Sequence, residues 1–381
     1  MTESRTTVMH EEESVGTLRF VHEGLAQRVA FAAGDAAESL TAEVALLGGT
    51  RVMVIASPAE RELAERISSD LPVVLHHDEV VMHVPLGVAE RARTAAAAHE
   101  VDVIVSVGGG STTGLAKAVA LTSGLPIVAV PTTYAGSEAT SVWGLTEGAR
   151  KTTGSDHKVL PRAVVYDASL TLTLPVNMSV ASGLNALAHC IDSMWGPQAD
   201  PIDRAFAAEA IRALADGLPG IVADPTGIPG REQTLYGAYL AAVAFSSAGS
   251  GLHHKICHVL GGMYNLPHAQ THAVVLPHVL AFNVASAPEA ERRMAAAFGA
   301  ASAVEGLEQL RRAIHAPRAL QDYGLAESGI SAAVDAIMPL VPANNPRKVT
   351  RDELSRLLHD AWKGVAPDDR RIHDGAGAGL A

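Results

Sequence analysis

The chain has 381 residues, a length that two domains accommodate better than one compact core. Hydrophobic residues make up 48% of it but are dispersed, and no apolar run reaches eighteen residues, so we expect no membrane span. The formal net charge of −12 disfavours nucleic acid and anionic lipid as partners, because phosphate binding needs a concentrated basic surface.

The N-terminal sequence MTESRTTVMHEEES is acidic and polar, without the basic and apolar regions of a secretory signal. Five short apolar runs then predict strands: RVMVIAS (51–57), PVVLHH (72–77), VDVIVSVGGG (101–110), PIVAVPTT (126–133) and PRAVVYD (161–167). Each precedes a helix or turn sequence, which is typical of buried parallel strands joined by right-handed crossovers. Between the last two runs, TEGARKTTGSDHK predicts an exposed hairpin or loop.

After Leu174-Pro175 the chain changes to amphipathic Ala/Leu segments with no further strand-like run. Asp200-Pro201 with Asp203 predicts the start of a helix. We therefore expect an α/β plus all-α chain, with a Rossmann-like parallel-sheet domain that binds a dinucleotide (1–172) and a helical domain (173–381). The tail HDGAGAGLA is expected to be disordered.

The only cysteines, Cys190 and Cys257, are expected to be reduced and buried, which together with the N-terminal sequence predicts a cytoplasmic protein.

Two glycine- or hydroxyl-rich turns predict a nucleotide site. The strand VDVIVSV leads into Gly108, Gly109, Gly110 and Ser111 and then into a helical stretch, so that backbone N–H groups and a helix N-terminus can face a pyrophosphate. The next strand ends in PTTYAGSE, which places Thr132, Thr133 and Ser137 at the same carboxyl edge, where open α/β sheets bind ligands. One such turn is weak support, but two on neighbouring strands are much stronger.

The first run ends at Ser57, where many dinucleotide sites carry an acid for the adenosine ribose. A serine does not repel a 2′-phosphate, and Arg61 is close in sequence. We therefore expect both NADH and NADPH to be accepted.

Histidines concentrate in three segments of the second half: GLNALAH (183–189), LHHKICH (252–258) and LPH (266–268). Asn185 and His189 are four residues apart, as are His254 and His258, so each pair shares a helix face. A lone histidine on an apolar helix is more often a core residue, but several at helical spacing favour a site. His272 and His278 are assigned to the core.

These motifs together resemble the iron-containing, group III alcohol dehydrogenases: GGGS after a strand, PTT followed by GSE, the GxxAxxH helix and HxxxHxLGGxYNxPH. The resemblance covers nearly the whole chain and implies a dehydroquinate synthase-like fold. It implies that the metal ligands of the family, an aspartate and three histidines, fall on Asn185, His189, His254 and His268. His258 matches a family histidine near the reacting centre, and Lys158 a lysine near the nicotinamide ribose.

The departures from the family pattern, with GGGSTTGLAKA and CHVLGG, look like the maleylacetate reductase branch, which reduces the C=C bond of maleylacetate to 3-oxoadipate. Asn185 replaces the metal-binding carboxylate. A ketone that receives hydride becomes a localised alkoxide, which a metal stabilises, whereas hydride addition to a conjugated alkene leaves an enolate that hydrogen-bond donors can stabilise. We therefore expect metal to be absent; if a metal is present, His189, His254 and His268 are its ligands.

In this reading His254 or His258 donates a proton to the enolate oxygen, because the imidazole pKa lies near neutrality. His189, His268 and Tyr134 complete the candidate catalytic set, and His253, Lys255 and Asn185 are candidates for contacts with a small dicarboxylate substrate. Family resemblance implies a homodimer. Three alternatives remain: a metal-dependent alcohol dehydrogenase or aldehyde reductase, a lyase resembling dehydroquinate synthase, and a nucleotide-binding protein without catalysis, against which the histidine cluster argues.

Overall fold

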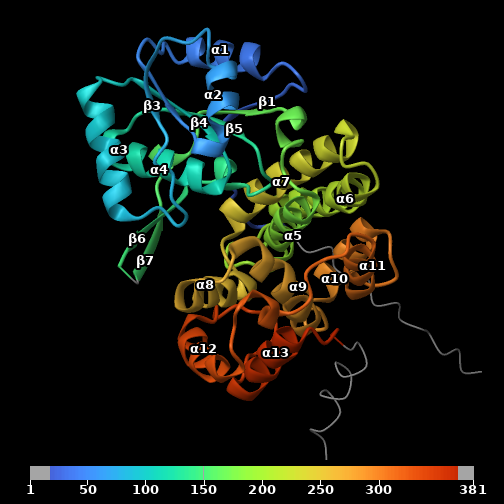
Figure 1. Ribbon diagram of the computed structural model, residues 1–381. Helices are drawn as coiled ribbons and strands as arrows, with labels where there is room; N and C mark the ends of the chain where they lie inside the picture. Colours follow the sequence, from blue (N-terminus) through green and yellow to red (C-terminus); the bar gives the residue numbers. More distant parts are fainter. Residues whose placement is uncertain (1–17, 149, 368–381) are drawn as a thin grey trace, which may run out of the picture.

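The first half of the chain forms a six-stranded parallel sheet in a computed structural model that describes residues 18–148 and 150–367 (Figure 1). Its strand order is β1-β8-β5-β4-β2-β3. The bounds are β1 (Arg28–Phe31), β2 (Val52–Ile55), β3 (Val73–His77), β4 (Val103–Gly108), β5 (Ile127–Pro131) and β8 (Ala163–Tyr166). The five predicted strands are confirmed as β2, β3, β4, β5 and β8, all parallel to their neighbours.

The strand β1 escaped prediction because it is an edge strand whose residues are only half-buried or exposed. Its sequence, RVAF, therefore needs no continuous apolar run. By contrast, every residue of β2, β4, β5 and β8 is buried.

Helices cover both faces of the sheet (Figure 1), and the side chains of β2 pack alternately against the helices of one face and of the other. Val52 and Val54 pack with α1 (Ala36–Leu46) and α2 (Arg61–Ile67). Met53 and Ile55 pack on the other face with α3 (Leu86–Ala98) and α4 (Gly110–Ser123). This two-period alternation is what a strand buried on both faces requires.

The segment predicted as an exposed hairpin or loop is a hairpin. Strands β6 (Val142–Glu147) and β7 (Arg150–Ser155) pair antiparallel as a separate two-stranded sheet. The hairpin projects from the sheet domain on the side that faces the helical half (Figure 1). Short 3-10 turns flank it and the sheet strands: η1 (Pro58–Glu60), η2 (Ser137–Ala139), η3 (His157–Val159) and η4 (Ala168–Thr171).

The second half is helical, as predicted, and the described residues contain no strand after β8. Its helices are α5 (Val176–Ser193), α6 (Pro201–Ala223), α7 (Ile228–Ala248), α8 (Leu252–Tyr264), α9 (His268–Val284), α10 (Pro288–Phe298), α11 (Ala303–Ala313), α12 (Ile330–Ile337) and α13 (Arg351–Lys363), with 3-10 turns η5 (Leu320–Tyr323), η6 (Glu327–Gly329) and η7 (Met338–Leu340). Helix α6 begins as predicted, with a capping box in which Asp200 accepts hydrogen bonds from the backbone of Asp203 and Ile202.

The two halves share a core, because Tyr134, Val164 and Tyr166 pack in the same cluster as α5, α6 and α7. The proposed boundary at residue 172 falls between η4 and α5 and stays a prediction. Both cysteines are free and buried, as expected. None of the described helices combines the length and the apolar character that a membrane crossing needs. The N-terminal segment MTESRTTVMHEEES and the tail HDGAGAGLA lie outside the described residues.

Candidate active site between the sheet edge and the histidine helices

The predicted phosphate-binding turn lies between β4 and α4. Gly108 has φ +149°, and a Cβ there would lie 2.5 Å from Thr112 Oγ1, so only glycine fits without strain. Gly109 caps α4, which starts at Gly110, and no side chain occupies the cap. Ser111 follows, half-buried, in the first turn. The helix N-terminus is thus left with backbone N–H groups for an anionic ligand.

The turn after β5 lies beside it, because Gly108 pairs with Pro131. The Thr132 amide donates to the Gly108 carbonyl at 3.2 Å, and a Cβ on Gly109 would meet Thr133 Cγ2 at 3.0 Å. Ser137 is half-buried at the start of η2. The structure therefore brings the glycine turn and the PTT turn together at one edge of the sheet, as the sequence predicts.

Glu60, which the sequence analysis missed, lies at this edge. Its carboxylate accepts hydrogen bonds from Thr132 Oγ1 at 2.6 Å and from Ser57 Oγ at 2.9 Å. A Cβ on Gly108 would lie 2.6 Å from Glu60 Oε2. Ser57 lies just beyond the end of β2, close to where expected, and its hydroxyl holds the Glu60 carboxylate at the edge of the sheet where open α/β sheets bind ligands.

Three helices bring the histidines together. Helix α5 carries Asn185 and His189, α8 carries His253, His254 and His258, and α9 starts at His268 and carries His272. The ring centroids of His189 and His254 lie 5.0 Å apart, and those of His254 and His272 lie 4.8 Å apart. The predicted convergence of the helical faces is thus present in the structure. His272, assigned to the core from sequence, is fully buried and also belongs to this cluster.

Asp192 orients His254. Its Oδ2 accepts from His254 Nδ1 at 2.7 Å and from the backbone N–H groups of Gly251 at 3.0 Å and His254 at 3.2 Å. Burial raises the pKa of Asp192 to about 7, although the hydrogen bonds from these backbone N–H groups lower it. Burial also holds the pKa of His254 well below its usual range. Because three N–H groups favour the ionised carboxylate, we place the shared proton on His254 Nδ1. The buried Nε2 of His254, which has no hydrogen-bond partner among the described residues, is then an acceptor.

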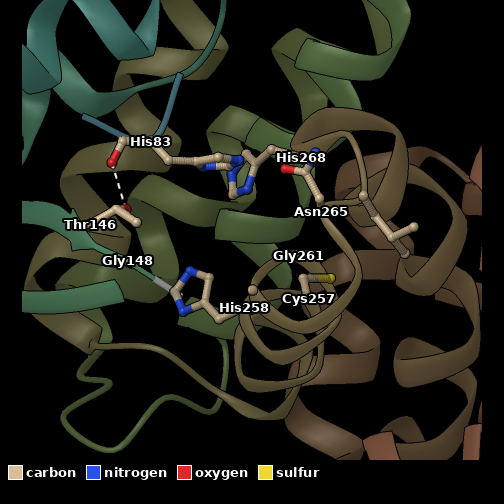
Figure 2. Close-up of a pocket in the computed structure, with 10 residues that line it drawn as sticks. His83, Thr146, Gly148, Cys257, His258, Gly261, Asn265 and His268 are labelled. Carbon is tan, nitrogen blue, oxygen red and sulfur yellow. Dashed lines mark hydrogen bonds between the residues drawn. The ribbon is translucent and has the colours of Figure 1, made fainter. Parts of the chain in front are cut away.

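A pocket of about 160 Å³ opens at the exposed end of the cluster, under the β6–β7 hairpin (Figure 2). His258 and His268 line it from α8 and α9, with ring centroids 6.5 Å apart. His83 and Thr146 also line it, and the Thr146 hydroxyl donates to the His83 carbonyl at 2.8 Å. The other residues that line it are Gly148, Cys257, Gly261, Gly262, Asn265 and Leu266.

The turn after β5 connects the predicted nucleotide site with the histidine cluster. A Cβ on Gly136, which has φ +77°, would lie 3.6 Å from His189 Cε1. The same segment that carries Thr132 and Thr133 therefore reaches the histidine cluster.

Five other predicted residues do not line the pocket. Tyr134 is fully buried in the shared core, where its hydroxyl donates to Thr171 Oγ1 at 3.3 Å, so a packing role explains it without a substrate. His253 is fully buried and bonded to His272, Lys255 is half-buried on α8, and Asn185 is buried at 3% exposure on α5. Lys158 is exposed on η3.

The donor set at the family's metal positions fits a divalent ion poorly. Asn185 supplies a neutral amide, whereas iron sites of this kind pair imidazoles with a carboxylate. The nearby carboxylate of Asp192 is engaged with His254 Nδ1. Among the described residues, no three of His189, His254, His268 and the acidic side chains have ligand atoms within 4.8 Å of one another.

Sequence spacing could have found some of the missed residues. Asp192 lies three residues after His189 and so shares its helix face, and His272 is four residues after His268. His83 and Glu60 gave no comparable pattern, because their contacts depend on the packing of distant segments.

Comparisons with known proteins match this architecture. The model described as iron-containing alcohol dehydrogenase matches residues 26–168, and the C-terminal model of the Fe-containing alcohol dehydrogenase family matches residues 179–362. A maleylacetate reductase of Burkholderia cepacia is 44% identical over 91% of this chain and 99% of its own.

Two solved structures extend the comparison. A structure of an iron-containing alcohol dehydrogenase from Corynebacterium glutamicum ATCC 13032 is 62% identical, with a TM-score of 0.92 over 94% of this chain and 100% of that one. A structure of maleylacetate reductase from Agrobacterium tumefaciens is 38% identical, with a TM-score of 0.87 over 92% of this chain and 100% of that one.

Proposed function

The chain belongs to the iron-containing alcohol dehydrogenase family, and from this premise we propose that it is a maleylacetate reductase, an NAD(P)H-dependent oxidoreductase that acts on a CH–CH group. The observation that carries the proposal is Asn185 at the position of the family's metal-binding carboxylate, together with a pocket lined by two exposed histidines, His258 and His268. Relatives named maleylacetate reductase that match over almost their whole length support the same reading.

The reaction consumes one hydride and one proton. A nicotinamide held at the glycine and PTT turns would supply the hydride to the alkene carbon far from the ketone, so that the C=C electron pair shifts toward the carbonyl as an enolate. Protonation of that enolate, directly at carbon or through its oxygen, gives 3-oxoadipate. The enolate charge is spread over several atoms, so hydrogen-bond donors can stabilise it.

His258 is the better placed of the two predicted proton donors. It is exposed and lines the pocket, whereas His254 is 2% exposed and presents an acceptor nitrogen while Asp192 holds its Nδ1 proton. We assign His254 the role of fixing the local arrangement of rings, since its ring contacts both His189 and His258. His268 pairs with His258 across the pocket and suits a substrate carboxylate.

The side chains at the family's metal positions, with the neutral amide of Asn185 in place of a carboxylate, fit a divalent ion poorly, and this supports reduction without a metal. We therefore derive no step through a metal.

NADH is proposed as the preferred cofactor, with NADPH accepted more weakly. The support is the Glu60 carboxylate, held by Ser57 and Thr132 at the edge where a ribose is expected. A carboxylate accepts hydrogen bonds from ribose hydroxyls and repels a 2′-phosphate.

The test is NADH oxidation by the purified protein with maleylacetate and with simple aldehydes, with and without chelator, together with the metal content. The proposal expects 3-oxoadipate as product, turnover that survives the chelator, and little turnover of aldehydes. A His258→Ala variant should lose at least about 100-fold in kcat, the lower end of what a positioned general acid contributes. Full turnover in that variant would refute the donor role.

A metal-dependent alcohol dehydrogenase is the second candidate, favoured by the name of the Corynebacterium relative. It predicts stoichiometric metal, loss of activity with chelator and turnover of simple alcohols.

The proposed assembly is a cytoplasmic homodimer. Sedimentation of the purified protein can test the dimer.

A further inference from the structure

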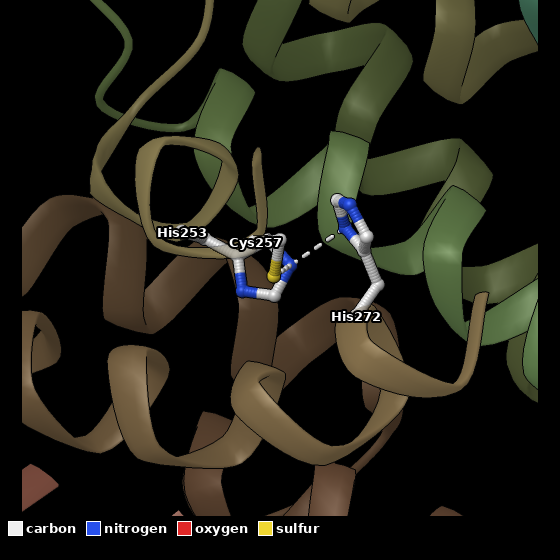
Figure 3. Close-up of side chains that lie close together, drawn as sticks. All are labelled: His253, Cys257 and His272. Carbon is white, nitrogen blue, oxygen red and sulfur yellow. Dashed lines mark hydrogen bonds between the residues drawn. The ribbon is translucent and has the colours of Figure 1, made fainter. Parts of the chain in front are cut away.

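A second group of potential ligands is formed by His253 and Cys257 of α8 and His272 of α9 (Figure 3), and Cys257 also lines the pocket. His253 Nε2 lies 2.9 Å from His272 Nδ1 and 3.6 Å from Cys257 Sγ. One ligand atom from each residue lies within 4.8 Å of the others. The proposed reduction uses none of these three side chains.

We propose that His253, Cys257 and His272 form a site for a single thiophilic divalent cation, such as zinc, cobalt or cadmium, separate from the family's metal position. The two imidazoles and the thiolate are the ligand types that such cations prefer. The spacing along the chain supports it, because His253 and Cys257 are one helical turn apart and share a face.

The distances come close to a tetrahedral site. With metal–nitrogen bonds of about 2.05 Å and a metal–sulfur bond of about 2.3 Å, the nitrogen–sulfur edge is about 3.6 Å and the nitrogen–nitrogen edge about 3.3 Å. The observed nitrogen–sulfur distance of 3.6 Å agrees. The His253–His272 distance of 2.9 Å would open by about 0.4 Å as the hydrogen bond is replaced by two metal bonds.

Cys257 provides the entry to this site. It lines the pocket, while His253 and His272 are fully buried behind it. A cation can therefore reach the sulfur from the pocket, and water in the pocket can supply the fourth ligand. His189, Asn185 and His268 are not required.

Binding releases one proton. The sulfur–hydrogen bond breaks, the sulfur–metal bond forms, and the thiol proton passes to the solvent. The proton shared by His253 and His272 moves to a ring nitrogen that faces away, His253 Nδ1 or His272 Nε2, neither of which has a hydrogen-bond partner among the described residues. Burial raises the pKa of the Cys257 thiol well above its usual range, so we expect the affinity to increase with pH.

Cobalt titration of the reduced full-length protein tests the site, because a Co²⁺–thiolate bond gives a near-ultraviolet charge-transfer band that imidazole and amide ligands do not. We expect one equivalent of Co²⁺ with this band. Cys257→Ser should abolish the band, and Cys190→Ser, which alters the other buried thiol, should keep it. His189→Ala, at the family's metal position, should also keep it.

Two measurements guard against a variant that does not fold. The first is a circular dichroism spectrum of each variant, which shows whether it is folded. The second is Co²⁺ binding by His253→Gln, which leaves both thiols intact and should weaken that binding at least tenfold. The proposal is overturned if the wild-type protein binds no Co²⁺, if it binds Co²⁺ without the band, or if His189→Ala or Cys190→Ser removes the band.

Discussion

Replacing Glu60 with glutamine should shift the cofactor preference toward NADPH. The carboxylate is held at 2.6 Å by Thr132 Oγ1 and at 2.9 Å by Ser57 Oγ. Glutamine has the same shape and keeps one acceptor, and either hydroxyl can turn to accept from the new amide. The substitution therefore removes charge with little change of geometry.

The magnitude follows from Coulomb's law. A carboxylate within reach of the ribose would lie about 5 Å from a 2′-phosphate that carries nearly two charges, and in a water-like dielectric the two repel by about 2 kcal/mol. Glu60 is only half-buried, so the water-like dielectric and the small repulsion energy that it gives are the appropriate choice. It corresponds to about a 30-fold change in the KM for NADPH. NADH loses one charge-assisted hydrogen bond, about 1 kcal/mol, which is about fivefold.

The assay is the initial rate of cofactor oxidation at saturating maleylacetate, with NADH or NADPH varied, at low and at physiological ionic strength. Glu60→Gln should lower the KM for NADPH about 30-fold, and less at higher salt because the repulsion is screened. Arg61→Gln, which removes a nearby cation, is a matched control that should not improve NADPH. A KM for NADPH that stays within twofold of the wild-type value in Glu60→Gln would show that the carboxylate does not face the ribose.

Three further changes probe the histidine cluster and the helical half. Asp192→Asn should reduce kcat about 10- to 100-fold with little change in the thermal midpoint, whereas Asp192→Ala should also destabilise the protein by about 1–3 kcal/mol for each buried donor left without an acceptor, as thermal unfolding would show. Asn185→Asp should bind metal tightly, measured by elemental analysis, without faster C=C reduction; faster reduction with bound metal would contradict the metal-independent route. Burial holds the pKa of His278 at about 3, so the unfolded chain binds the proton first and stability falls as pH drops below about 6.5, by about 2 kcal/mol at pH 5. His278→Gln should flatten the dependence of unfolding free energy on pH between 7 and 5, and an unchanged slope would argue against this assignment.

The fold could be predicted from sequence where one local property decides the structure. Continuous apolar runs identified the strands buried on both faces, and Asp200 with Pro201 identified the start of α6. The edge strand β1 could not be found this way, because it is stabilised by pairing with β8 and not by burial on two faces. Its assignment depends on a partner more than 130 residues away, as the pairing of Arg28 with Ala163 shows.

The helices that carry the candidate site could be predicted from sequence, but the roles of its individual side chains could be predicted only in part. Helical spacing placed His189, His254 and His258 on converging faces, but it could not say which ring is buried. Burial is decided by Phe245 of α7, whose ring centroid lies 4.2 Å from that of His254 and 4.7 Å from that of His189. The burial of Tyr134 could not be predicted either. Its position next to Thr133 suggested a polar role, but α5 and η4 enclose its side chain.

Burial also decides how the histidines can share the work of the reaction. Each turnover consumes a proton, and a group that donates it must recover one from solvent before the next cycle. His189 and His253 have pKa values lowered to about 3 by burial, so they remain neutral at physiological pH. The exposed rings of His258 and His268 meet both requirements, contact with the pocket and contact with water. In the proposed reduction, the buried histidines therefore serve to shape the site, and His258 and His268 are the pair through which the proton would enter.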